Sequence, residues 1–223
     1  MYMQEGRVTP LGPSKNKNTK DIFIIDLKPS EVNTKATDFR GLIQLYLQAV
    51  LHWSGSCPEC GVFFHRHSGY YRKTPFGGLE FRIQRVICPE CSSTHALIPC
   101  FIFPYNQVLA HVKQAAMEGL CYETHTCEQL AEFCGVEPST IWRWWKCFQA
   151  ISQSLLKWLA RELAKTTSYT DWTRGDYSTG QLRVQKIFSL LGLYRDTFYP
   201  DFSHDIFCLL CLKKPLLFCQ AYR

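Results

Sequence analysis

The sequence lacks an apolar run of the roughly 18–20 residues that a bilayer-spanning helix needs. Its longest candidate, residues 206–218, is interrupted by Lys213, Lys214 and Pro215. Residues 1–20 are polar and do not contain the apolar core of a signal peptide. We therefore expect a cytoplasmic protein without membrane contact, in which cysteines are reduced.

Signatures of catalysis are also missing. The chain has no glycine-rich phosphate loop and no nucleophile motif. Two-metal chemistry needs acidic residues that converge from different elements of one scaffold, whereas the candidate acidic residues of this chain fall in loops and helical segments. These residues are Asp171, Asp176, Asp196, Asp201 and Asp205. The sequence thus predicts neither an enzyme nor a small-molecule substrate.

Net charge is modest. The formal charge is +6, and residues 105–165 contain six basic and six acidic residues. A strongly basic surface is the usual electrostatic sign of a nucleic-acid partner. The modest charge of this chain does not by itself indicate such a partner. A nucleic-acid function therefore has to be argued from motifs.

Cysteine, by contrast, is abundant, and four of the 12 cysteines form two Cys-Pro-Glu-Cys pairs. The pairs are Cys57/Cys60 and Cys88/Cys91, and the 27 residues between them have the pattern of a β-hairpin. Two such pairs in a reduced protein predict one tetrahedral Zn²⁺ site, with iron as the rival metal. A site closed by four cysteines is structural, because it leaves no position open for a reacting water.

A third pair, Cys208 and Cys211, lies in an apolar segment without a matching pair elsewhere. We interpret these cysteines as buried apolar side chains, with a second metal site as the less favoured alternative. The unpaired cysteines are assigned to the core on the same grounds. They are Cys100, Cys121, Cys127, Cys134 and Cys147.

The predicted organisation has four parts. Residues 1–20 form a flexible basic tail, and residues 21–104 hold a short strand, a helix and the zinc ribbon. Residues 105–165 form a helix-turn-helix with an extended third helix, and residues 166–223 are a C-terminal helical segment. The expected fold class is mainly α with a small β zinc ribbon (α+β), the ribbon being followed by a tri-helical helix-turn-helix.

The helix-turn-helix prediction comes from the segment between Cys127 and Lys146. Ala131 supplies the small residue needed where two helices cross, Gly135 supplies the turn, and Ile141 anchors the second helix inward. Thr126 and Gln129 have the spacing of a capping box. An unrelated helical hairpin is the alternative.

This alignment makes four residues of the second helix candidate DNA contacts. Arg143 can reach a guanine edge through its bidentate fork, and Ser139 and Lys146 suit phosphates. Trp142 suits a thymine methyl group or a sugar, but three tryptophans occur within four residues, so at least two are expected in a core or an interface.

The hairpin supplies the remaining candidate DNA contacts, which are Arg72, Lys73, Arg82 and Arg85. Beside Tyr70 and Tyr71 they could bind phosphates while the rings stack on bases. The alternative to DNA contact is a solvated charged ribbon that packs against the rest of the protein, which would have the same pattern of basic residues.

An apolar stripe continues along the third predicted helix. Its residues recur every three to four positions and are Ile141, Trp144, Phe148, Ile151, Leu155 and Trp158. The stripe approximates a heptad repeat that would form a homodimer, and packing on the C-terminal helices of the same chain is an equal alternative.

The order of these features resembles a known group. It runs from a short strand and a helix through CPEC-Gly, a Tyr-Tyr-Arg hairpin, Arg-Val-Ile-CPEC and Thr-His-Ala-Leu-Ile-Pro to the helix-turn-helix. This order resembles bacterial zinc-ribbon/helix-turn-helix proteins of unknown function, mostly from Firmicutes, over about residues 21–150. Ser92 departs from the pattern, since glycine is common there, and we expect the turn at Ser92 to differ.

Those proteins are similar in turn to the N-terminal part of insertion-sequence transposases. The resemblance implies that both modules bind double-stranded DNA at the ends of the element, while a separate acidic domain cuts. Only 58 residues follow Lys165. We expect these to be too few for a ribonuclease-H-like catalytic domain.

The sequence therefore predicts a zinc-containing DNA-binding protein that is transposition-associated or regulates transcription, has no catalytic domain of its own and lies near the bacterial nucleoid. A protein-interaction adaptor is the main alternative, and the near-neutral charge of residues 105–165 favours this interpretation. A truncated transposase remnant is a further one.

Overall fold

The computed structural model describes residues 22–25, 39–73, 80–105, 107–165, 179–200 and 205–214. They divide into two compact units. The first contains the described residues up to Leu109 together with residues 211–214, and the second contains those from Ala110 to Leu210. The tail predicted over residues 1–20 lies outside the described residues.

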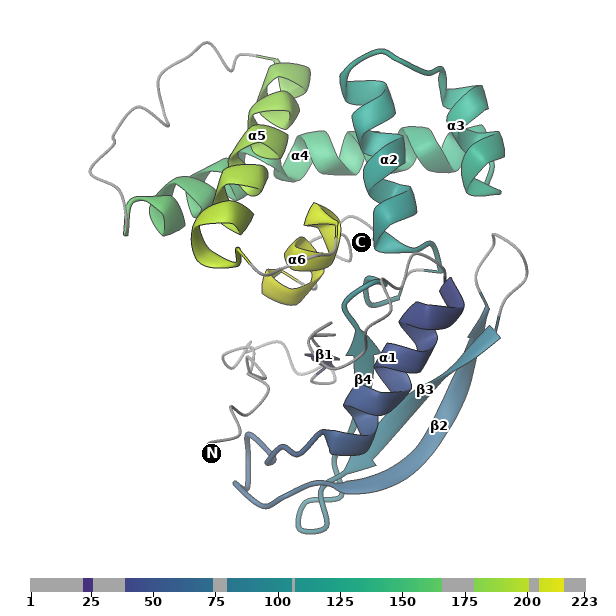
Figure 1. Cartoon of the computed structure of the whole chain (residues 1–223), viewed down its shortest axis with the longest axis vertical. Coiled ribbons are helices and arrows are strands. Elements are labelled where there is room, and N and C mark those ends of the chain that lie inside the picture. The colour runs from purple at the N-terminus through teal and green to yellow at the C-terminus, as the bar shows by residue number, and fades with distance from the viewer. Residues whose placement is uncertain are drawn as a thin grey trace. The chain divides into compact units, whose positions relative to one another are not determined.

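The first unit is built on one mixed sheet of four strands (Figure 1). The strands are β1 (Ile22–Ile25), β2 (His65–Lys73), β3 (Glu80–Ile87) and β4 (Thr94–Pro99), in the order β1-β4-β3-β2. β1 runs parallel to β4, whereas β2 with β3 and β3 with β4 are antiparallel.

The predicted fold class, mainly α with a small ribbon and a tri-helical helix-turn-helix, is wrong. The Thr94–Pro99 segment lies outside the ribbon strands that the sequence predicts, but it is β4, an inner strand of the sheet. A short apolar run does not by itself separate a strand from a buried helix segment, so the type of this element is ambiguous in the sequence. Because β4 pairs with β1 as well as β3, the expected thin ribbon is part of a wider sheet.

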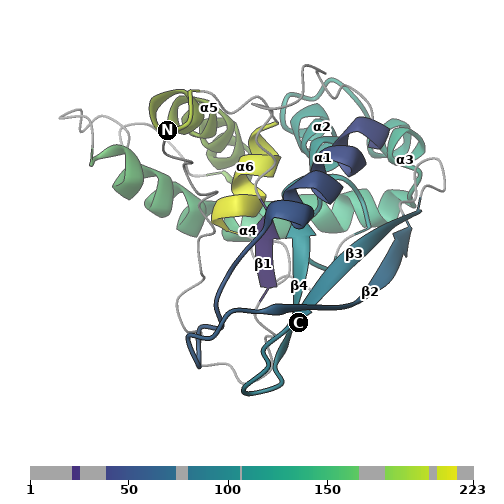
Figure 2. The ribbon, with the colours of Figure 1, turned by 60° about the horizontal axis from the view of Figure 1, so that its bottom comes forward.

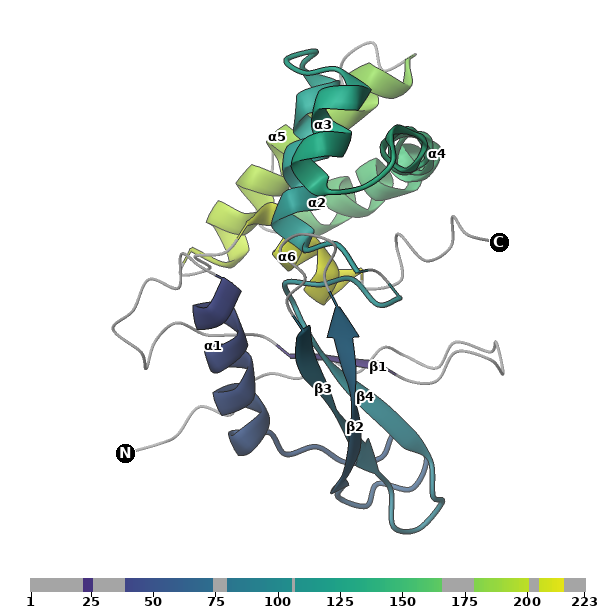
Figure 3. The same ribbon diagram turned by 90° about the vertical axis from the view of Figure 1, so that its right-hand side faces the viewer.

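Helix α1 (Phe39–His52) lies along one face of this sheet (Figure 3). Its Tyr46 hydroxyl donates to the Leu97 carbonyl at 2.7 Å and accepts from the Gln84 backbone N–H at 2.9 Å. The pairing between β3 and β4 ends at Arg85 and Ala96, so Tyr46 joins the two strands beyond that point. Burial raises the pKa of Tyr46, which keeps the hydroxyl protonated as a donor.

The end of α1 is held by a side chain from β2. The Arg66 guanidinium donates to the carbonyls of Val50 at 3.1 Å and Leu51 at 2.6 Å. The last carbonyls of a helix have no partner within the helix, and a cation there also complements the helix dipole. Arg66 therefore fixes α1 to the hairpin.

The second unit is helical (Figure 2). Its helices are α2 (Ala110–Cys121), α3 (Cys127–Cys134), α4 (Pro138–Leu163), α5 (Gly180–Phe198) and most of α6 (Ile206–Lys213). The predicted capping box at Thr126 and Gln129 is confirmed, and Gly135 closes α3 in a left-handed conformation with φ 64°. None of the described helices combines the length and apolarity that a membrane crossing requires.

The apolar stripe of α4 packs within the chain. Phe148 contacts Phe188 of α5 and Phe207 of α6, and the Trp158 ring lies 5.3 Å from that of Tyr194 on α5. Helices α4, α5 and α6 therefore share one core. Packing on the C-terminal helices of the same chain is one of the two alternatives for the stripe. The homodimer stays a prediction.

Candidate metal centre and basic surfaces

The first Cys-Pro-Glu-Cys turn folds back on its leading cysteine. The Cys57 carbonyl accepts from the Gly61 N–H at 2.8 Å, and the Cys57 N–H donates to the Val62 carbonyl at 2.8 Å. Gly61 has φ 72°, in the left-handed region that favours glycine. This turn presents the thiols of Cys57 and Cys60 on one side.

The second turn repeats the first, residue for residue. The Cys88 carbonyl accepts from the Ser92 N–H at 3.0 Å, and the Cys88 N–H donates to the Ser93 carbonyl at 2.9 Å. Ser92 has φ 58°. The expectation that this turn would differ is therefore wrong, because serine occupies the same left-handed position that Gly61 occupies in the first turn.

The two turns bring four thiols together. The sulfur atoms of Cys57, Cys60, Cys88 and Cys91 all lie within 4.8 Å of one another, and Cys57 Sγ is 3.7 Å from Cys91 Sγ. A tetrahedral site with metal–sulfur distances near 2.3 Å has sulfur–sulfur edges of about 3.8 Å. Cys57 and Cys88 are buried, and Cys60 and Cys91 are exposed. The cluster can hold a metal ion, as the spacing predicted.

The electrostatics of the cluster favour a cation. The Ser93 hydroxyl, 3.0 Å from Cys91 Sγ, and the Ser93 backbone N–H lower the pKa of Cys91 to about 6. A hydrogen bond with Cys91, then desolvation and a hydrogen bond with Cys57, raise the pKa of Cys60 to about 12. Four adjacent thiolates repel one another, so a bound cation is needed before all four can ionise.

A buried histidine supports the cluster from behind. His95 Nε2 lies 3.1 Å from the Ser93 hydroxyl, which contacts Cys91 in turn. The His95 ring packs against Phe64, with centroids 4.8 Å apart, and against Phe23 at 5.4 Å. Sequence analysis missed Ser93 and His95, and their only signal was polar residues directly after the second cysteine pair. Hydrogen bonds of this kind orient metal ligands and tune them.

We expect Ser92→Gly to stabilise the protein. A left-handed conformation costs a residue with a side chain about 1–2 kcal/mol, and glycine avoids this cost. Part of the stabilisation is offset, because glycine gives the unfolded chain more conformational entropy. The net gain should be about 0.5–1 kcal/mol in the free energy of unfolding of the first unit. Urea unfolding of the metal-loaded protein measures it.

Ser56→Gly is the matched control for Ser92→Gly. Ser56 is also an exposed serine beside a cluster cysteine, but its φ is not positive, and it pairs with Phe63 across the first turn. Glycine there should lower stability slightly, since it adds freedom only to the unfolded chain. Equal effects of the two substitutions would show that the Ser92 conformation carries no strain.

The third cysteine pair takes no part in a metal cluster among the described residues. Cys208 and Cys211 are both buried, and the Cys211 thiol donates to the Ile102 carbonyl at 3.3 Å. Their surroundings agree with the interpretation as apolar core residues.

The predicted DNA contacts of the hairpin do not form one surface. Arg72 and Arg85 line the same pocket on the sheet. Lys73 forms an ion pair with Glu80 at 3.0 Å. Arg82 lies over Gly69, where an added Cβ would stand 2.6 Å from the Arg82 Nε. Of the four, Arg72 and Arg85 line this pocket together, and Arg72 and Lys73 line a second hollow beside it.

The four predicted contacts of α4 all lie on its exposed side. They are Ser139, Trp142, Arg143 and Lys146. Trp142 is 50% exposed, and the Lys146 ammonium lies 4.7 Å from the centre of its ring. Trp144 and Trp145 are buried, which confirms that at least two of the three tryptophans are in a core.

A protein-family profile described as Domain of unknown function (DUF6431) matches residues 57–144. Comparison with curated proteins and with solved structures gives no match. The matched region starts at the first cluster cysteine and ends in the second turn of α4. The match agrees with the resemblance to proteins of unknown function and carries no information on transposases.

Proposed function

We propose that the chain is a DNA-binding protein with one structural zinc ion, either associated with transposition or regulating transcription. The observation that carries this proposal is the exposed group of Trp142, Arg143 and Lys146 on α4. The cysteine cluster and the start of α4 fall in one region matched by the family profile, so the proposed zinc site and the proposed contacts of α4 belong to the same matched segment.

Zinc is the proposed metal because of the ligand set. Four cysteine sulfurs form a soft tetrahedral set, which zinc and iron–sulfur centres prefer over the hard cations. The cluster joins two hydrogen-bonded turns at one end of the sheet, the arrangement of a structural zinc site. All four positions are protein ligands, so the metal would hold the turns together and carry no reaction.

Helix α4 is suited to the major groove because its start is rigid. Ile141 and Phe148 are fully buried and anchor one side, while α3 ends at Gly135 in a fixed turn. The opposite side then presents a guanidinium, an ammonium and an aromatic ring. In this proposal Arg143 contacts a guanine edge, Lys146 and Ser139 bind phosphates, and Trp142 packs on a sugar or a thymine methyl group.

We expect Arg143→Ala to weaken binding to the preferred duplex by about 1–3 kcal/mol and to random duplex by less. In-vitro selection with zinc-loaded protein identifies the preferred sequence, and fluorescence anisotropy then gives both affinities. Arg161→Ala is the control, because Arg161 is an exposed arginine near the other end of the same helix. An equal loss on both duplexes would reduce Arg143 to a phosphate contact, and no loss on either would remove α4 from the interface.

A protein-interaction adaptor is the second candidate, because several apolar side chains are exposed on the first unit. Leu47 and Leu51 of α1 are 47% and 60% exposed, and Phe63 beside the cysteine cluster is 69% exposed. Salt separates the two functions. Affinity for DNA should fall steeply between low and physiological salt if phosphates are bound, whereas an apolar protein interface responds weakly.

A further inference from the structure

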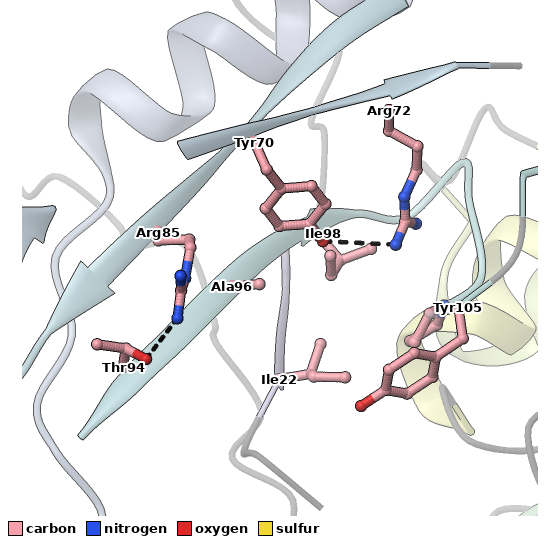
Figure 4. Close-up of a pocket in the computed structure, with 9 residues that line it drawn as sticks. Ile22, Tyr70, Arg72, Arg85, Thr94, Ala96, Ile98 and Tyr105 are labelled. Atoms are coloured by element: carbon pink, nitrogen blue, oxygen red, sulfur yellow. Dashed lines mark hydrogen bonds between the residues drawn. The ribbon is translucent and has the colours of Figure 1, made fainter. Parts of the chain in front are cut away.

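The sheet carries a pocket of about 200 Å³ on the face away from α1 (Figure 4). Ile22 and Arg85 both stand opposite Ala96 in the strand register, so the three share this face. The next residue along β1, Phe23, projects to the other face, where its ring meets that of Trp53 just after α1. Ile22, Ala96 and Ile98 give the pocket an apolar floor.

Two arginines border this floor, and none of the described residues that line the pocket is acidic. Arg85 donates to the Thr94 hydroxyl at 2.6 Å, which fixes its guanidinium beside the floor. Arg72 donates to the Tyr70 hydroxyl at 3.4 Å, while its Nη1 atom is buried with no hydrogen-bond partner among the residues that the structure describes. A buried donor without a partner costs about 1–3 kcal/mol. An anion in this pocket would lower that cost.

Two tyrosines complete the lining. Tyr70 lies over the floor next to Arg72, and Tyr105 stands across the pocket with its hydroxyl turned toward Ile22 (Figure 4). Tyr105 is 67% exposed and has φ 60°, a conformation that costs a side-chain-bearing residue about 1–2 kcal/mol. Such strain is typical of residues held in place for binding. No local sequence pattern signals it.

A second hollow of about 440 Å³ adjoins the pocket. Arg72 and Tyr105 line both, and Tyr71 lines the second one together with Lys73 and Glu80, which form an ion pair at 3.0 Å. Tyr71 is 71% exposed. An exposed aromatic ring therefore continues the edge strand beyond the pocket, whereas the charge of Lys73 is paired with Glu80.

We propose that this face binds single-stranded DNA, with one unpaired base on the apolar floor beside Tyr105 and its phosphate at Arg72 and Arg85. Exposed rings next to cations are the usual means of binding single strands without sequence preference. The continuation past the exposed Tyr71 ring favours a strand over a free nucleotide. The proposal goes beyond duplex binding at α4 and does not depend on it.

The test uses the full zinc-loaded chain and fluorescence anisotropy with labelled oligothymidylate of about 12 nucleotides, within the site sizes usual for such surfaces. Tyr105→Gly removes the ring and also relieves the left-handed strain, so this variant should remain folded. Arg72→Gln removes the charge. Each is expected to lower single-strand affinity about 10-fold, the usual range for losing one stacked base or one phosphate contact, with duplex affinity unchanged.

Arg40→Gln is the charge control, because Arg40 is exposed on α1. It should leave single-strand affinity unchanged. Unchanged single-strand affinity in both pocket variants would overturn the proposal, as would an equal loss on duplex DNA. Thymidine monophosphate binding as tightly as the oligonucleotide would assign the pocket to a small molecule instead. Arg143→Ala is expected to lower duplex affinity and to leave single-strand affinity unchanged. A failure of the proposed duplex binding can therefore be distinguished from a failure of single-strand binding.

Discussion

Cys88→Ser is expected to release the metal and to unfold the cysteine end of the first unit. Cys88 is fully buried, and its backbone closes the second turn. Structural zinc sites contribute about 10–16 kcal/mol of apparent binding free energy, as much as or more than the total stability of an ordinary domain. Elemental analysis should give about one zinc per wild-type chain and almost none in the variant. A lower melting temperature should accompany the loss.

Cys127→Ser is the control for Cys88→Ser. Cys127 is a half-buried cysteine on α3 outside the cluster, so its substitution should leave the metal content unchanged. Full metal content in Cys88→Ser would disprove the four-cysteine site. Two metal equivalents in the wild type would revive a second site at Cys208 and Cys211. Iron in place of zinc would keep the site and change the metal.

The metal cluster could be predicted from the sequence because its chemistry is local. Two residues between paired cysteines place both thiols on one tight turn whatever the rest of the chain does, and the capping box at Thr126 and Gln129 is local in the same way. Gly135 likewise marked the end of α3. Each of these signals lies within a few residues of the feature that it predicts.

The sheet could not be predicted because its pairing is distant. β1 joins β4 across more than 70 residues, with Ile22 opposite Ala96, and no local pattern records that contact. The β4 sequence is apolar on both faces, so its periodicity does not separate a strand from a buried helix. Once β4 is an inner strand, the cysteine turns belong to a sheet with a helix on one face, and the expected fold class fails.

The same dependence on register explains which basic residues meet. Arg72, Lys73, Arg82 and Arg85 are close in the sequence of one hairpin, yet strand alternation separates Arg82 from Arg85. An irregularity between Arg66 and Gly69 also shifts the pairing of β2 with β3. A shift of one residue moves a side chain to the other face. A count of charges on a hairpin therefore does not define a surface.

Phe148→Ala is expected to lower the free energy of unfolding of the second unit by about 3–5 kcal/mol, the usual cost of deleting a buried aromatic ring. Phe148 is fully buried, and its ring centroid lies 5.9 Å from that of Phe188 and 5.5 Å from that of Phe207. Phe188 and Phe207 stack with an angle of 7° between their rings. Removing the central ring leaves a cavity between three helices, which backbone relaxation closes only in part.

Phe133→Ala separates this effect from the loss of an aromatic ring as such. Phe133 lies on α3 and is 54% exposed, so its removal should change the free energy of unfolding by less than about 0.5 kcal/mol. Urea unfolding followed by circular dichroism at helical wavelengths compares the two variants. Similar small losses would contradict the packing of Phe148 against Phe188 and Phe207. A large loss confined to Phe148→Ala would confirm that this ring is buried in a core. Light scattering at micromolar concentration then tests the homodimer, because a monomeric mass with and without DNA would rule it out.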